Sequence, residues 1–78
     1  AVAFERLWAE KPVSGRVELQ LRNGETVVPQ GVVGPLSETE CLECAVEESD
    51  GSYSLHAVAW DAVIQIVCRG LEDLPDDL

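Results

Sequence analysis

The chain opens with apolar residues at helical spacing. Phe4, Leu7 and Trp8 fall at positions i, i+3 and i+4, with charged residues between and beside them. This pattern predicts a short amphipathic helix over residues 1–11. Pro12 ends it, because the residue before a proline is driven out of the helical region of backbone space. A helix this short is unstable alone in water, so we expect Phe4 and Trp8 to cover a hydrophobic core.

Next, Val17, Leu19 and Leu21 alternate with polar residues, and residues 15–28 are predicted to form a β-hairpin. Asn23-Gly24 stands between the two arms and favours a two-residue type I′ turn, in which both residues take positive φ. Pro29 ends or edges the second arm. The register that this turn would impose gives the cross-strand pairs Arg22 with Glu25, Leu21 with Thr26 and Leu19 with Val28.

A second hairpin is predicted over residues 40–60, with its turn at Asp50-Gly51. A two-residue loop would place one wholly apolar set of residues on one face, as in a sheet that packs on one side. That set is Val46 with Leu55, Cys44 with Ala57, and Leu42 with Ala59. The opposite face would then carry Cys41 with Trp60, Glu43 with Val58, and Ala45 with His56.

The last predicted strand covers Val63 to Cys68 and is apolar on both faces, so we expect it to be central or covered on both sides. One helix and five strands predict a mainly β (α+β) fold, either a bent five-stranded antiparallel sheet or a small, partly open Sm-like barrel. Residues 1–70 form a single small domain on this interpretation. Residues 71–78 form an acidic tail that we expect to be mobile.

This layout resembles the small Sm-like and SH3-like β-barrels, and within them the Rho-binding antiterminator type. The resemblance rests on the charged hairpin of residues 17–25 with its Asn23-Gly24, an irregular middle, the second hairpin, and the closing Asp61-Ala62-Val63-Ile64. It implies a small regulatory binding protein that presents acids to a nucleic-acid-binding surface. The wider Sm group implies a ring-forming RNA binder, but this chain lacks the basic and Asn-rich loops through which such rings hold RNA.

Charge is the strongest compositional signal. Fifteen Asp and Glu oppose five Lys and Arg, giving a net charge of −10 at pH 7. The acids could form a face for a basic partner, or they could be spread over the surface as in proteins that work in molar salt. Their dispersal, the single Lys and the preference for Val over Ile favour a halophile-type protein.

The same charge disfavours nucleic acid as a partner, because such binders need Lys and Arg to displace counterions from phosphates. No apolar run approaches the roughly 20 residues that span a bilayer. The sequence also shows no basic-then-apolar leader. We therefore expect a cytoplasmic protein without membrane association.

Cys41-Leu42-Glu43-Cys44 is the only stretch with metal-ligand spacing, and Cys41, Cys44, His56 and Cys68 together would supply four zinc ligands. The strand pattern opposes this set, because residues three apart in a strand point to opposite faces about 10 Å apart. We therefore predict no metal, no cofactor, and cysteines that serve as small buried apolar residues with reduced thiols. A zinc-stabilised, nucleic-acid-associated domain is the alternative.

No motif for catalysis is present: there is no nucleophile elbow and no phosphate loop, so we expect no enzyme activity. The sequence instead predicts a small non-enzymatic interaction or regulatory module that acts through protein–protein contacts. Its candidate contact residues are Trp60, His56 and Val58, on the less buried face of the second hairpin. Covering of that face by the N-terminal helix is the competing interpretation. The partner could be a second copy of the chain, bound through an edge strand or the Trp60 face.

Overall fold

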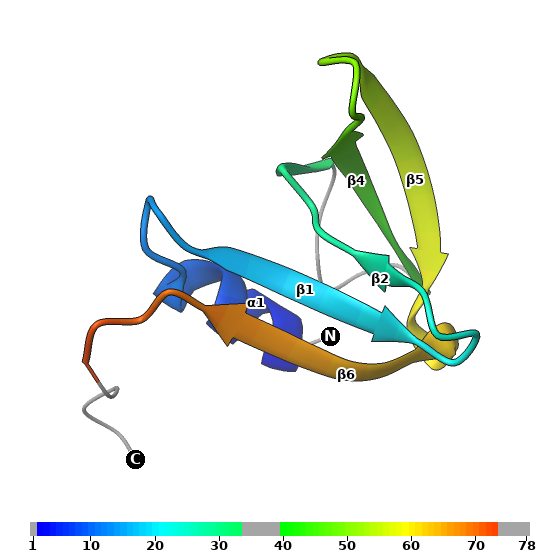
Figure 1. Cartoon of the computed structure of the whole chain (residues 1–78). Coiled ribbons are helices and arrows are strands. Elements are labelled where there is room, and N and C mark those ends of the chain that lie inside the picture. The colour runs from blue at the N-terminus through cyan, green and yellow to red at the C-terminus, as the bar shows by residue number, and fades with distance from the viewer. Residues whose placement is uncertain (1, 34–39, 74–78) are drawn as a thin grey trace.

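The computed structural model describes residues 2–33 and 40–73, which form one α-helix, six strands and a 3₁₀ turn (Figure 1). The first sheet has the order β2-β1-β6 and the second the order β3-β4-β5. The predicted mainly β fold with a short N-terminal helix is confirmed, with two three-stranded antiparallel sheets where one sheet of five strands was predicted. The elements are α1 (Val2–Glu10), β1 (Arg16–Leu21), β2 (Thr26–Val27), β3 (Gly31–Val33), β4 (Cys41–Glu47), β5 (Tyr53–Ala59), η1 (Trp60–Ala62) and β6 (Val63–Arg69).

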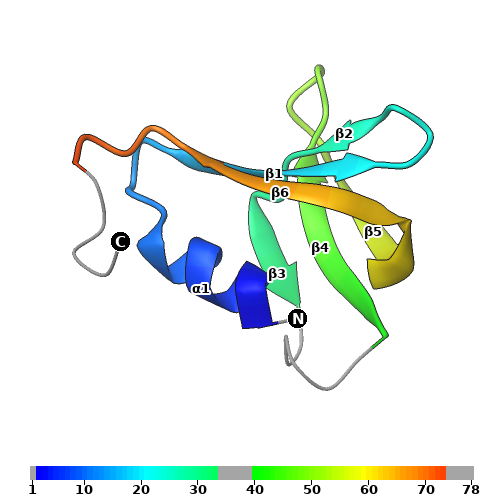
Figure 2. The ribbon, with the colours of Figure 1, turned by 90° about the horizontal axis from the view of Figure 1, so that it is seen from below.

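The two sheets meet at a steep angle, and α1 lies beside β1 and β6 (Figures 1 and 2). The core sits between the helix and the two sheets. Its fully buried side chains come from α1, β1 and β4: Phe4, Val17, Leu19, Leu42 and Cys44. In the part of the chain that the structure describes, no helix is long and apolar enough to cross a membrane. The predicted tail lies outside the described residues from position 74 onward.

Helix α1 forms as its pattern predicts. Phe4 is fully buried, Leu7 and Trp8 pack against the core, and the last helical hydrogen bond runs from Lys11 N to Leu7 O at 3.1 Å. Pro12 prevents continuation. The Lys11 ammonium then lies 5.4 Å from the centroid of the Trp8 ring, a cation–π contact beside the end of the helix.

The first hairpin forms, but its predicted register is wrong by one residue. Leu19 pairs with Val27 and Gln20 with Thr26. Gly24 has φ of 89°, and no other residue type has positive φ among the described residues, so the turn is not type I′. Hydrogen bonds from Gly24 N to Leu21 O and from Leu21 N to Glu25 O enclose a three-residue loop. In this loop only glycine takes the left-handed conformation, which a side chain would strain.

The second hairpin departs from its prediction in the same way. Gly51 has φ of 87°, and Glu48 N donates to Ser52 O across a three-residue loop. The pairs are now Leu42 with Val58, Cys44 with His56, and Val46 with Ser54. This register buries Val58 beside Leu42, whereas the predicted one would have placed the smaller Ala59 there. Leu55, predicted on the apolar face with Ala57 and Ala59, lies on the outer face and is 80% exposed.

Pro29 marks the passage from one sheet to the other. It is buried between β2 and β3, and its lack of an N–H group interrupts strand pairing. Strand pairing resumes at Gly31, where β3 pairs with β4 of the second sheet.

The prediction that the last strand is central or covered on both faces is wrong. In the described part of the chain β6 pairs only with β1, so it is an edge strand. Helix α1 packs against it. The register with β1 shifts at Gln20/Leu21, where Gln65 and Val63 are paired and Ile64 is passed over. Ile64 is therefore the extra residue of a bulge and is 63% exposed.

Candidate functional site

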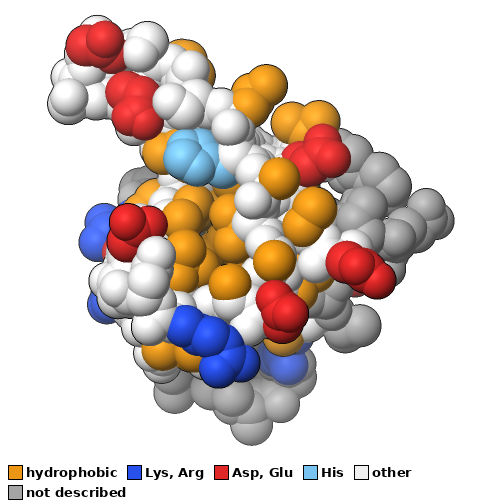
Figure 3. All heavy atoms as spheres, turned by 90° about the vertical axis from the view of Figure 1, so that its right-hand side faces the viewer, with side chains coloured by type: hydrophobic (Ala, Val, Ile, Leu, Met, Phe, Trp, Pro, Cys, Tyr) orange, Lys and Arg blue, Asp and Glu red, His pale blue; other side chains and the backbone are white. Residues whose placement is uncertain are grey.

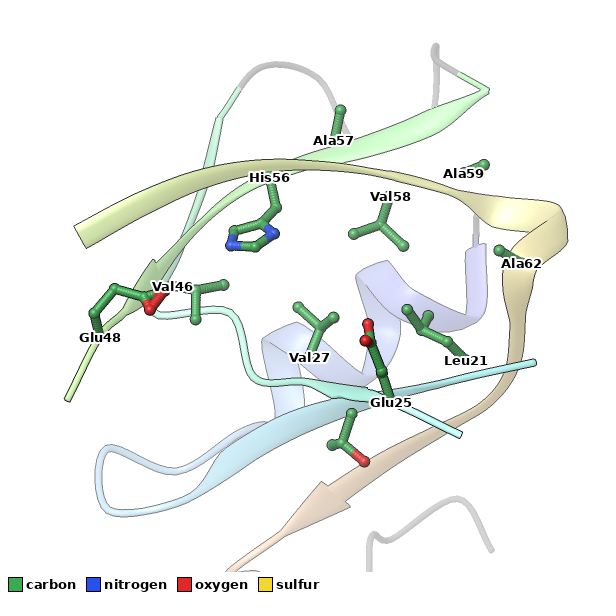
Figure 4. Close-up of a pocket in the computed structure, with 11 residues that line it drawn as sticks. Leu21, Glu25, Val27, Val46, Glu48, His56, Ala57, Val58, Ala59 and Ala62 are labelled. Atoms are coloured by element: carbon green, nitrogen blue, oxygen red, sulfur yellow. The ribbon is translucent and has the colours of Figure 1, made fainter. Parts of the chain in front are cut away.

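A groove of about 510 Å³ lies between the two sheets (Figure 4). Its walls come from the end of the first hairpin on one side and from β4 and β5 on the other. No residue of α1 lines it among the described residues. The lining residues are Leu21, Glu25, Thr26, Val27, Val46, Glu48, His56, Ala57, Val58, Ala59 and Ala62.

The floor of the groove is apolar. Leu21 and Val27 face it from the first hairpin, and Val46 and Val58 face it from the second sheet (Figure 4). Leu21, Val27 and Val46 also pack against the buried core, so they are partly covered already. The two one-residue register differences create this arrangement, since they turn Val27 and Val58 toward the space between the sheets.

The rim of the groove is anionic. The Glu25 carboxylate reaches up from the first hairpin, and Glu48 lies just after β4, where its Oε1 accepts a hydrogen bond from Ser54 Oγ at 3.0 Å (Figure 4). His56 adds an exposed imidazole. No Lys or Arg occurs among the described residues that line the groove. Figure 3 shows the apolar side chains gathered in a hollow beside the pale-blue His56 ring, with acidic groups spaced around it and basic groups at its lower edge.

The uneven distribution of basic residues along the sequence explains why the rim is acidic. From Asn23 to Cys68 there is no Lys or Arg. All of the basic residues lie in α1, β1, β6 and the segments that adjoin them: Arg6, Lys11, Arg16, Arg22 and Arg69. The second sheet and the residues that line the groove therefore carry only acidic formal charges, whereas Arg22 lies next to the lining residue Leu21 and the first sheet and the helix carry charges of both signs.

The three predicted contact residues lie in different surroundings. Val58 is 7% exposed and belongs to the inner face, so the predicted register that put it on the less buried face is wrong. His56 is exposed and lines the groove. Trp60 lies in η1 and packs against α1, with its ring centroid 5.4 Å from that of Phe4. The helix therefore packs against Trp60, whereas no described residue of α1 lies in the groove beside His56.

The indole Nε1 of Trp60 is buried and has no hydrogen-bond partner among the described residues. Phe4 also stacks on Trp8 at 5.6 Å, so three aromatic rings form one cluster that joins α1 to η1. This cluster holds the helix onto the body of the fold.

The alternative zinc set is not brought together. Cys41 and Cys44 lie in β4 with their side chains on opposite faces, as the strand pattern predicted. Cys68 lies in β6 opposite Val17, in the other sheet. Nowhere in the described part of the chain do three His, Cys, Asp or Glu side chains gather closely enough to hold a metal ion. Cys44 is fully buried, and this burial raises the pKa of its thiol.

The outer face of the second sheet is a further exposed apolar surface. Val33, Tyr53 and Leu55 are 50%, 64% and 80% exposed on it. Their cross-strand partners place Glu43 and Glu47 on the same face.

Sequence reasoning missed Leu21, Val27, Glu25 and Glu48 as members of a site. Leu21 and Val27 are apolar in the sequence pattern, but the wrong predicted register did not show that Val27 faces the groove. The absence of Lys and Arg between Arg22 and Arg69 was the available signal for the anionic half. Comparison with protein families, with curated proteins and with solved structures found no match.

Proposed function

We propose that this protein is a small non-enzymatic interaction module that binds a partner protein through the groove between its two sheets. The observation that carries the proposal is an apolar floor left accessible between two carboxylates, Glu25 and Glu48. An accessible apolar hollow with a polar rim is the usual anatomy of a protein contact surface.

The proposed setting is a halophile-type cytoplasm. At about 1 M salt the Debye length falls to about 3 Å, so repulsion between dispersed carboxylates is screened. Contacts at hydrogen-bond distance remain attractive under these conditions, and apolar contacts are strengthened by excluded salts. An apolar groove with close charged contacts at its rim suits binding in such a medium.

The proposal also covers how the two sheets are related to each other. The two sheets would be the halves of one partly open, Sm-like barrel, since β2 and β3 follow each other across Pro29 and each lies at the edge of its sheet. On this interpretation β2 and β3 are one strand broken at the proline, and the five predicted strands are recovered.

Selection from a random-peptide phage library on the immobilised protein tests the function. We expect enriched peptides to lose binding to the double variant Glu25→Lys/Glu48→Lys. The control, Glu10→Lys/Glu72→Lys, makes the same charge change at exposed positions outside the groove and should keep binding. No enrichment, or equal binding to both double variants, would refute the groove as a protein-binding site.

A further inference from the structure

The outer edge of β5 is an unpaired strand edge among the described residues. In the part of the chain that the structure describes, β5 pairs with β4 on one side only. It runs for seven residues, Tyr53–Ala59, in unbroken register and contains no Asp, Glu, Lys, Arg, Pro or Gly. Proteins ordinarily protect such edges with charges, prolines or bulges, because an open edge is a template for another strand. This edge has none of these protections.

The hydrogen bonds of the hairpin fix which groups face outward. Glu48 N donates to Ser52 O, and Trp60 N donates to Glu40 O. Even-numbered residues therefore form the hydrogen-bonded pairs of this antiparallel ladder, because such pairs alternate along the strand. The odd-numbered residues of β5 must direct their N–H and C=O groups away from β4. These are Tyr53, Leu55, Ala57 and Ala59.

This edge is also a wall of the groove. His56, Ala57, Val58 and Ala59 are consecutive and all line it. Figure 4 shows His56 and Val58 pointing into the groove and Ala57 and Ala59 pointing away from it, so the two alanines contribute backbone. A segment lying in the groove would therefore meet unpaired peptide groups as well as the apolar floor.

Resting on the function proposed above, we infer that the groove takes an extended, cationic segment of a partner protein, which adds as a strand to the outer edge of β5. Alternate side chains of the segment would be apolar and would pack on the floor of the groove, formed by Leu21, Val27, Val46 and Val58. The intervening side chains would point away from the floor and would be Lys or Arg, whose long flexible stems let the charged ends reach back to the carboxylates of the rim.

Charge complementarity selects this occupant over a second copy of the chain. The rim carries Glu25 and Glu48, and neither the described lining of the groove nor the sequence from Asn23 to Cys68 contains a Lys or Arg. A second copy would bring a net charge of −10 to the same place. Basic side chains at the rim would instead form charge-assisted hydrogen bonds with the two carboxylates.

The test uses the whole chain, labelled with ¹⁵N, and a synthetic peptide of four Lys-Val repeats with blocked ends. We expect addition of the peptide to slow hydrogen exchange at the amides of Leu55, Ala57 and Ala59. The amides of Ser54, His56 and Val58 already bond within the hairpin and should change little. The same peptide with N-methyl groups on alternate residues should lose binding, because it cannot complete the ladder.

Variants test the charge argument. Glu25→Lys/Glu48→Lys should weaken binding of the Lys-Val peptide about tenfold, and Glu10→Lys/Glu72→Lys by less than about twofold. If the charge reversal unfolds the chain, Glu25→Gln/Glu48→Gln removes the charges at constant size and should still weaken binding. A peptide of Glu-Val repeats that bound equally well would overturn the cationic assignment.

Three further outcomes overturn the inference. The first is peptide binding in the groove without protection of the odd-numbered amides, which would leave the proposed function standing but exclude strand addition. The second is protection that grows with protein concentration in the absence of peptide, which would make a second copy the occupant. The third is binding that perturbs only the outer face around Tyr53 and Leu55.

Discussion

Cys44 and His56 are direct cross-strand partners on the inner face of the second sheet, yet Cys44 is fully buried and His56 is exposed. The pair therefore spans the boundary between the core and the groove. Cys44 lies in the core next to Leu42, while His56 lies on β5, an edge strand among the described residues, and remains exposed. This boundary has consequences for thiol chemistry.

Cys44 should be the least reactive of the three cysteines. Burial raises the pKa of its thiol, so the nucleophilic thiolate is scarce at neutral pH and the reagent has no access. We expect iodoacetamide to label Cys68 in the native protein, and Cys44 only when the fold opens. Peptide mass mapping after timed labelling at pH 8 measures this. Equal rates for Cys44 and Cys68 would show that β4 is not packed as described.

The aromatic cluster should dominate stability. Phe4 is fully buried between Trp8 and Trp60, and removal of a buried Phe costs about 3–5 kcal/mol. A domain this small has about that much stability in total, so Phe4→Ala should be largely unfolded at 25 °C. Near-UV circular dichroism of the two tryptophans reports the loss. Val13→Ala, at a fully exposed position, is the control and should change stability by less than about 0.5 kcal/mol.

Substitutions in the two hairpin turns can distinguish the observed three-residue loops from type I′ turns. Asn23 Oδ1 and Asp50 Oδ1 accept hydrogen bonds from the backbone N–H groups of Glu25 and Ser52. The bonds that Ser52 donates also lower the pKa of Asp50. Because neither residue has positive φ, Asn23→Gly and Asp50→Gly should each destabilise the fold by about 1 kcal/mol in urea unfolding. A type I′ turn, which Gly-Gly also fits, should tolerate both changes with little loss of stability.

The glycines of the same turns should resist replacement. Gly24 and Gly51 have positive φ, and a Cβ there would meet no atom within 4 Å, so any cost is backbone strain rather than a clash. Gly24→Ala and Gly51→Ala should each lower the free energy of unfolding by about 1–2 kcal/mol. Unfolding curves without a shift would argue for a different loop conformation.

Glu18 makes the stability of the first sheet depend on pH. Arg16 and Arg69 are cross-strand partners, and Glu18 accepts hydrogen bonds from Arg16 Nε at 2.6 Å and from Arg69 Nε at 2.9 Å. The Arg16 and Arg69 guanidinium groups lower the pKa of Glu18 below its usual value. Its stabilising effect is therefore complete above the unfolded-state pKa and is lost as pH falls through the folded-state pKa.

Glu18→Gln should accordingly destabilise the protein at pH 7, because the two opposed guanidinium groups then lose their shared carboxylate. The difference from the unsubstituted protein should shrink as pH falls below about 4.5, where the unfolded-state carboxyl is protonated. Thermal melts across this range measure both effects. Glu72→Gln, at an exposed position after β6, is the matched control. A constant difference at all pH values would contradict the role of the ion pairs.

The halophile interpretation predicts a specific salt response. Screening of the net charge of −10 is nearly complete at about 1 M salt, where the Debye length is about 3 Å. We expect the melting temperature to go on rising above about 1 M KCl, because salt ions and water held by the surface carboxylates contribute beyond screening. A plateau well below that concentration would indicate an ordinary acidic protein.

Several features followed from the sequence alone, because they depend on neighbouring residues. The spacing of Phe4, Leu7 and Trp8 determined the helix, and Pro12 its end. Alternating residues determined both hairpins, and the strand pattern of β4 was enough to place Cys41 and Cys44 on opposite faces. These inferences need only the local geometry of helices and strands.

The tertiary structure decided the register, the edges and the groove. Asn-Gly and Asp-Gly permit two-residue and three-residue loops alike, and the choice rests on which side chains, Val58 or Ala59, fill the space beside Leu42. A shift of one residue reverses the face of every side chain on a strand, so this choice exposed Leu55 and turned Val27 and Val58 inward. Packing between segments distant in sequence, and not the local pattern, therefore placed Glu25 and Glu48 at the rim of one apolar groove.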